Sequence, residues 1–189
     1  MNVYDVLKLS YADKSKQMKD MARHGYLYDS QLSNHNQQIY YNPKDRKIIN
    51  SIAGTHNLSD WGTDVYLGAG HLKDTDRYKP ADRALKEAKH KYNVDSAVVV
   101  GHSLGGAIAG YIAGANDKIV TYNKGATVGQ KVRKNEVALR TEGDIVSILD
   151  ENSKHMTTVH NNNKSTGFLP LDTLKAHNVD NLKNANIFI

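Results

Sequence analysis

One stretch of the sequence carries residues whose types and spacing could do covalent chemistry. It reads Gly101-His102-Ser103-Leu104-Gly105, a Gly-x-Ser-x-Gly pattern. A serine hydroxyl becomes a useful nucleophile when it stands on a tight turn beside a general base. Glycines two residues before and two residues after the serine remove side chains that would clash across such a turn. The pattern therefore predicts that Ser103 is a nucleophile for acyl transfer.

The segments on either side fit the strand-turn-helix context that this pattern needs. Residues 96–100 contain a valine run without alternation, which indicates a strand buried on both faces of a sheet. Residues 104–115 are rich in alanine and glycine, so this helix could lie close to the sheet. The amides at its start would point at the serine and stabilise negative charge there. The alternative is a glycine-rich turn with an incidental serine.

The rest of the chain alternates strands with helices, which indicates an α/β fold. The segment 42–46 contains Pro and Asp and predicts a turn between two hairpin strands. Pro80 begins a helix, because a first-turn residue needs no backbone N–H. We expect helices at 3–23, from 80, at 104–115 and at 171–175, strands at 38–41, 47–52, 96–100, 118–122, 137–140, 145–149 and 186–189, and a polar loop at 150–166. No repeat or linker divides the chain, so residues 1–189 are expected to form a single domain.

Composition narrows the class of protein. The chain has 189 residues, 39% of them hydrophobic, and its mean hydropathy is −0.61, which excludes an integral membrane protein. It contains no cysteine, which excludes disulfides, thiolate metal sites and a cysteine nucleophile. Residues 1–17 lack the apolar stretch of a secretory signal. These features predict a cytoplasmic or otherwise intracellular protein.

The charge of the chain indicates little about partners. It carries 25 Lys and Arg against 20 Asp and Glu, a formal net charge of +5. The lysines fall in loose groups interleaved with acids, so a solvated surface is the simplest interpretation and nucleic-acid binding is not expected. Peripheral contact with an anionic membrane surface remains the alternative.

Several stretches together resemble the class 3, fungal-type lipases of the α/β-hydrolase superfamily. They span residues 37–182 in the order of that family and read Tyr40-Tyr41-Asn42, Ala53-Gly54-Thr55, Asp60-Trp61, His102-Ser103-Leu104-Gly105-Gly106-Ala107, Thr121-Tyr122-Asn123, Asp144-Ile145-Val146 and His177-Asn178-Val179-Asp180-Asn181. Two departures are Ala53, where the family often has Arg, and Gly125-Ala126, which partly replaces Gly-x-Pro. The resemblance implies a compact α/β-hydrolase-like fold, with a mixed, mostly parallel sheet flanked by helices, and a carboxylic ester hydrolase.

The resemblance also implies the residues of a catalytic triad. Ser103 would be the nucleophile, Asp144 the acid and His177 the base, in the chain order Ser, Asp, His. Asp144 follows Gly143 at the end of an expected strand, and His177 begins a short turn. The rival acids are Glu142, Asp150 and Asp172, and the rival bases are His160 and then His155.

An oxyanion hole needs two donors. One is the backbone N–H of Leu104, directly after the nucleophile, and by resemblance the other is Thr55. His102 lies too close to Ser103 along the chain to act as the base, so we expect it to pack or to contact substrate. No cofactor or metal is expected.

The expected substrate is a carboxylic ester: a lipid, a phospholipid or a small soluble ester. The segment 68–79, where the family has its lid, is short and polar. The whole chain has only two Phe and one Trp. A small ester or a phospholipid therefore fits better than bulk fat. The alternative is a catalytically silent lipase-like fold used as a binding module or as a structural module of a virion or other assembly. A peptidase or thioesterase on the same fold is a third possibility.

Overall fold

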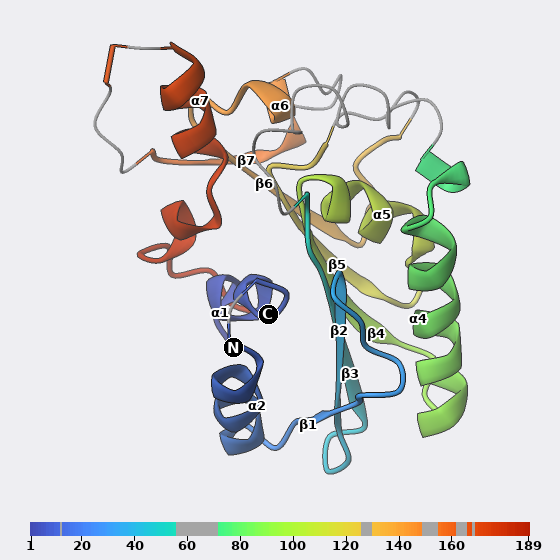
Figure 1. The fold of residues 1–189 in the computed structure, drawn as a ribbon. Coiled ribbons are helices and arrows are strands. Elements are labelled where there is room, and N and C mark those ends of the chain that lie inside the picture. Colours follow the sequence, from blue (N-terminus) through green and yellow to red (C-terminus); the bar gives the residue numbers. More distant parts are fainter. Residues whose placement is uncertain (12, 56–71, 126–129, 149–154, 162–165, 168) are drawn as a thin grey trace.

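The computed structural model describes residues 1–11, 13–55, 72–125, 130–148, 155–161, 166–167 and 169–189. Their central feature is a seven-stranded sheet whose strands follow one another in chain order (Figure 1). The first three strands are antiparallel, and the third to the seventh are parallel. The strands are β1 (Leu27–Tyr28), β2 (Gln37–Asn42), β3 (Lys47–Ile52), β4 (Ala97–His102), β5 (Lys118–Tyr122), β6 (Glu136–Thr141) and β7 (Thr157–Val159). The expected mixed, mostly parallel sheet is thus confirmed.

The valine strand lies at the centre of this sheet, as its run of β-branched residues predicted. In β4, Val99 pairs with Asn50 of β3 on one side and with Ile119 of β5 on the other. Val99 and Val100 are fully buried because helices cover both faces. The expected hairpin of β2 and β3 also forms. Its turn is stabilised by the side-chain oxygen of Asn42, which accepts hydrogen bonds from the backbone N–H groups of Lys44 and Asp45.

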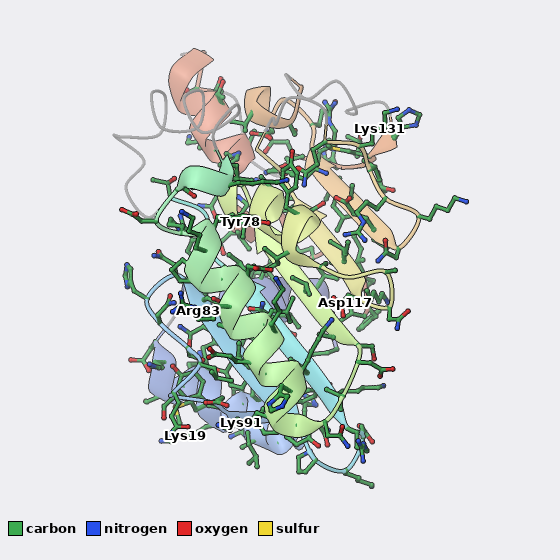
Figure 2. All side chains as sticks on the ribbon, turned by 90° about the vertical axis from the view of Figure 1, so that its right-hand side faces the viewer. Lys19, Tyr78, Arg83, Lys91, Asp117 and Lys131 are labelled. Carbon is green, nitrogen blue, oxygen red and sulfur yellow. The ribbon has the colours of Figure 1, made fainter. Side chains whose placement is uncertain are left out.

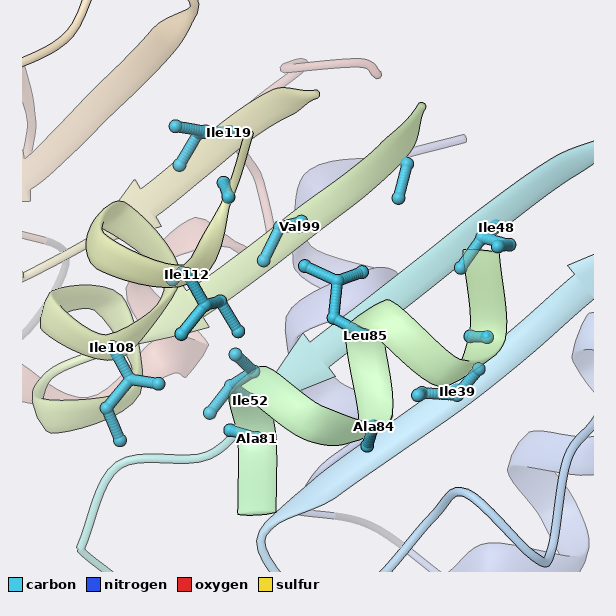
Figure 3. Close-up of a cluster of buried hydrophobic side chains, with 14 of the residues drawn as sticks. Ile39, Ile48, Ile52, Ala81, Ala84, Leu85, Val99, Ile108, Ile112 and Ile119 are labelled. Atoms are coloured by element: carbon cyan, nitrogen blue, oxygen red, sulfur yellow. The ribbon is translucent and has the colours of Figure 1, made fainter. Parts of the chain in front are cut away.

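Two hydrophobic clusters cover the opposite faces of the sheet. On one face, α4 (Tyr78–Tyr92) and α5 (Leu104–Ile112) pack Leu85, Ile108 and Ile112 against sheet residues that include Ile52 and Val99 (Figures 1 and 3). On the other face lie α1 (Val3–Lys8), α2 (Lys14–Arg23) and the 3-10 helix η3 (Val179–Leu182). The helix expected from Pro80 is α4, which begins two residues earlier. A short 3-10 helix, η1 (Leu72–Asp74), precedes it.

The helix expected over residues 3–23 is wrong as a single element, because it is broken into α1 and α2. The carboxylate of Asp13 accepts a hydrogen bond from the backbone N–H of Lys16 (3.0 Å) and so starts the second helix. The break carries Ser10 and Tyr11 toward the sheet, where the Ser10 hydroxyl lies 3.1 Å from that of Ser51. Helix α2 ends at Arg23, just before Gly25 with its φ of +80°, as expected.

The strand expected over residues 145–149 is a short helix instead, α6 (Ile145–Ile148). The Asp144 carboxylate accepts a hydrogen bond from the backbone N–H of Ser147 (3.0 Å), and this side-chain cap begins a helical turn. The apolar pair after Asp144 resembled a strand because two residues are too few to show a helical period.

Two further elements near the C-terminus differ from the expectation. Strand β7 lies inside the expected loop 150–166, where its threonines are exposed at the edge of the sheet. The segment 186–189 joins no strand and makes a single bridge between Phe188 and Asn2. The expected C-terminal helix is α7 (Leu169–His177).

Candidate active site

The predicted nucleophile lies on a strained turn between β4 and α5. Ser103 has φ = 54° and ψ = −124°, a conformation that a residue with a side chain rarely adopts. Its backbone is held on both sides: Ser103 N–H donates to the carbonyl oxygen of Tyr122 (3.0 Å), and Gly125 N–H donates to that of Ser103 (3.0 Å). The residue is 1% exposed, and its Oγ makes no hydrogen bond to the described residues.

The glycines of the motif are required by close backbone contacts. A Cβ at position 101 would lie 2.2 Å from the carbonyl oxygen of Gly105, and one at position 105 would lie 2.3 Å from that of Ile52. Real Cβ atoms do not approach so closely, so only glycine lets α5 turn back against the ends of β3 and β4. The spacing that singled out Ser103 thus has a steric cause.

The predicted acid and base are in direct contact. Nδ1 of His177, at the end of α7, lies 2.7 Å from Oδ1 of Asp144, and both side chains are buried. Burial alone would raise the pKa of Asp144, but the hydrogen bonds from His177 and Ser147 outweigh it and lower that pKa. Asp144 therefore stays ionised at neutral pH and fixes the orientation of the His177 ring.

His177 also lies against the turn that bears Ser103. Its ring centroid is 4.7 Å from that of His102, the residue before Ser103. The hydrogen bond from Ser103 to His177 that a triad requires is not formed in this structure. Such bonds are often long without substrate and shorten when the substrate binds.

The two predicted oxyanion donors belong to segments that adjoin the serine. Leu104 is the first residue of α5, so its N–H belongs to the positive end of that helix. Thr55 follows β3, and its neighbour Gly54 packs so closely on the serine that a Cβ there would lie 2.8 Å from Cβ of Ser103. The backbone after β3 thus contacts the serine.

His102 is neutral and links three segments of the site. Its Nδ1 lies 2.7 Å from the hydroxyl of Tyr11, and its Nε2 lies 2.8 Å from the backbone carbonyl oxygen of His177. The carbonyl can only accept, so Nε2 carries the proton and Nδ1 accepts from Tyr11. Complete burial, helped by the neighbouring His177, lowers the pKa of His102 to about 3. The expected packing role is thus observed.

The rival residues lie elsewhere or have other partners. Glu142 and His160 form an exposed pair, with 3.1 Å between Oε2 and Nδ1. His155 is exposed, and Asp172 accepts hydrogen bonds from Thr166. Asp150 lies outside the described residues, as do Asp60-Trp61 and residues 68–71 of the expected lid region.

Two residues of the site were missed by the sequence interpretation, Tyr11 and Arg77. The Tyr11 hydroxyl accepts a hydrogen bond from Gly54 N–H, and the Arg77 guanidinium donates to the carbonyl oxygens of Ala53 and Gly54. No sequence pattern signals these contacts, because the two residues are more than 20 positions from the loop that they hold. Within the described ranges, no three His, Asp or Glu side chains gather as metal ligands.

Comparisons with known proteins agree with the fold. No protein-family model matches the chain. Among solved structures, a Rhizomucor miehei lipase propeptide complex has a TM-score of 0.54 at 12% identity over 95% of this chain and 75% of that one. MDLA from Penicillium cyclopium has a TM-score of 0.51 at 15% identity over 87% of this chain and 77% of that one. The chain therefore has the α/β-hydrolase fold of the fungal lipases.

A curated relative is similar in sequence over part of the chain. An extracellular phospholipase A1 from Serratia liquefaciens is 37% identical over 86 residues, which are 45% of this chain. The match covers 25% of that relative's length. No helix in the described part of the chain is both long and apolar enough to cross a membrane.

Proposed function

We propose that the chain is a serine hydrolase that cleaves carboxylic esters of lipids. The observation that carries this proposal is the buried contact between His177 and Asp144 (2.7 Å) against the strained turn of Ser103. A buried carboxylate that orients an imidazole beside a strained serine turn has the parts of an acyl-transfer site.

In the proposed reaction, the Ser103 hydroxyl attacks the ester carbonyl while His177 takes its proton. Asp144 holds the His177 ring and stabilises the imidazolium that forms. The N–H groups of Leu104 and Thr55 donate to the oxyanion of the tetrahedral intermediate. The imidazolium then protonates the leaving alcohol, and water, activated by His177, hydrolyses the acyl-enzyme. Every proton that the reaction needs moves through His177.

The substrate we propose is a phospholipid or another lipid ester. The similarity to a protein named a phospholipase A1 supports a phospholipid substrate. The net charge of +5 is compatible with contact with an anionic lipid surface. Comparing phospholipid vesicles with and without phosphatidylglycerol would distinguish the need for a phospholipid substrate from the need for an anionic surface. We expect faster fatty acid release from the anionic vesicles and a loss of that advantage at high salt.

The proposal is tested by hydrolysis of p-nitrophenyl esters of increasing chain length. We expect turnover by the wild type and a loss of at least ~10³-fold in Ser103→Ala, because the nucleophile is gone. Ser96→Ala is the matched control, since Ser96 is an exposed serine before the same strand. Equal activity in Ser103→Ala and the wild type would contradict the proposal.

A second candidate function is a catalytically silent module for binding or assembly, such as one of a virion. It is favoured by the burial of Ser103, which is 1% exposed. A folded wild-type protein that cleaves neither p-nitrophenyl esters nor phospholipids would support this alternative.

A further inference from the structure

Arg77 reaches back from the start of α4 to the loop that follows β3. Its Nη1 donates to the carbonyl oxygen of Gly54 (3.0 Å), and its Nη2 donates to that of Ala53. One side chain therefore holds two successive carbonyls, both just before Thr55. A planar guanidinium fork suits this task because its donors are fixed relative to one another.

These contacts determine the direction of the Thr55 N–H. The carbonyl of Gly54 and the N–H of Thr55 belong to one planar, trans peptide unit, so they point in opposite directions. Once Arg77 holds the carbonyl, the N–H must point away from Arg77. The preceding peptide unit is held at both ends, by Arg77 at the Ala53 carbonyl and by the Tyr11 hydroxyl at the Gly54 N–H.

The charge of Arg77 acts on the same peptide unit. Burial lowers the pKa of Arg77, but a guanidinium remains charged across the range in which proteins work. A charge-assisted hydrogen bond to the Gly54 carbonyl polarises the peptide and makes the Thr55 N–H a stronger donor. This effect is greatest when negative charge develops on the substrate oxygen.

We propose that Arg77 is a positioning residue of the oxyanion hole: it holds the Ala53–Gly54 backbone so that the Thr55 N–H is presented to the tetrahedral intermediate. The inference rests on the proposed ester hydrolysis, since it assigns a support to one of its donors. Arg77 itself touches neither the substrate nor the reacting atoms.

Arg77→Met removes the fork and the charge and keeps much of the side-chain volume. With a p-nitrophenyl ester we expect kcat to fall more than ~10-fold, because the lost support affects the transition state. We expect KM to stay within about threefold, because the ground-state ester gains little from this donor. Binding of an alkylboronic acid, whose adduct on serine carries the tetrahedral oxygen, should weaken by a factor similar to that for kcat.

Arg77→Lys and Arg77→Ala keep the test decisive if the Met variant folds poorly. Lysine retains a charge but not the fork, so its kcat should lie between those of the wild type and Arg77→Met. A cavity of about 140 Å³ is lined by Arg77, Ile52 and Ala81 among other residues. We therefore expect millimolar guanidinium ion to bind in this cavity beside the backbone of residues 53–55 and to raise the kcat of Arg77→Ala.

Arg83→Met is the matched control, because Arg83 is an exposed arginine on α4, the helix that Arg77 directly precedes (Figure 2). Like Arg77→Met, this variant loses one positive charge, and its kcat should stay within twofold of the wild-type value. A folded Arg77→Met variant with wild-type kcat and boronic acid affinity would overturn the inference while leaving the ester hydrolase intact. A folded wild type with no hydrolysis and no reaction with a fluorophosphonate would overturn the proposed function and this inference together.

Discussion

Asp144 and His177 show how a single buried contact fixes the state of two groups. The ionised carboxylate of Asp144 accepts from Nδ1–H of His177, which leaves Nε2 of the ring as the proton acceptor. This tautomer is the one that can deprotonate a serine. The chemistry proposed for Ser103 therefore depends on the charge of Asp144.

Asp144→Asn should lower kcat by roughly 10³–10⁴-fold while the protein stays folded, because an amide that donates to Nδ1 enforces the wrong tautomer. Steady-state hydrolysis of a p-nitrophenyl ester measures the change. Glu142→Gln is the control, since Glu142 is the rival acid and pairs at the surface with His160. Similar losses in the two variants would contradict the assignment of Asp144.

His102 makes the stability of the fold depend on pH. Its pKa is about 3 in the folded protein, against about 6.5 in an unfolded chain. The unfolded chain thus binds a proton that the folded protein excludes as pH falls below about 6.5. Above that pH, His102 does not lower the free energy of unfolding. Below it, the free energy of unfolding falls progressively toward pH 3 and is lower by about 2 kcal/mol at pH 5.

Urea unfolding of the wild type and of His102→Gln between pH 7.5 and 5 tests this effect. The wild type should lose more free energy of unfolding over this range than the variant, by about 2 kcal/mol. Asp144 does not interfere, because a carboxyl with a lowered pKa begins to lose its stabilisation only near pH 4. Parallel pH dependences in the two proteins would show that His102 titrates normally.

At the scale of elements, the crossing of β4 and α5 sets the geometry of the site. The first turn of α5 lies against the backbone after β3 and β4, and only glycine at positions 101 and 105 permits this approach. The strain at Ser103 is thus imposed by the packing of a strand, a turn and a helix.

Gly101→Ala should destabilise the fold by more than about 3 kcal/mol, because a Cβ there would lie 2.2 Å from a backbone oxygen that cannot move alone. Gly114→Ala is the matched control, since a Cβ there would come no closer than 3.4 Å to the Asp117 carboxylate. Thermal unfolding followed by circular dichroism compares them. A small, equal shift in both melting temperatures would contradict the steric explanation.

The turn after β5 is supported by a buried ion pair. Nζ of Lys124 lies 2.9 Å from Oε1 of Glu136 on β6, and both side chains are fully buried. The next residue, Gly125, donates its N–H to the Ser103 carbonyl. The pair therefore joins the turn after β5 to β6, next to the residue that holds the Ser103 carbonyl.

Lys124→Met should cost about 3–5 kcal/mol, because it leaves the buried Glu136 carboxylate without its counter-charge. The double variant Lys124→Met/Glu136→Gln should recover part of this loss, since a neutral amide can still accept the hydrogen bond from Thr121. Urea unfolding of the two single variants and the double variant gives the coupling energy. Additive losses would show that the two residues do not interact.

At the scale of the whole molecule, the sequence predicted the structure best where a local residue pattern has a local steric cause. The valine strand, the glycine spacing around Ser103 and the Asn42 turn could be predicted because each depends on neighbours in the chain. Residues 145–148 and 157–159 were misassigned because a side-chain cap and an edge pairing determine them. The roles of Tyr11 and Arg77 could not be predicted, because they depend on how distant segments pack.

The most direct measurement is reaction of the folded protein with a fluorophosphonate, followed by mass spectrometry to locate the adduct. The wild type, Ser103→Ala and His177→Ala would be compared under the same conditions. The account predicts one adduct, on Ser103, that is lost in Ser103→Ala and forms far more slowly in His177→Ala. An adduct on another residue, or equally fast labelling of Ser103 without His177, would contradict it.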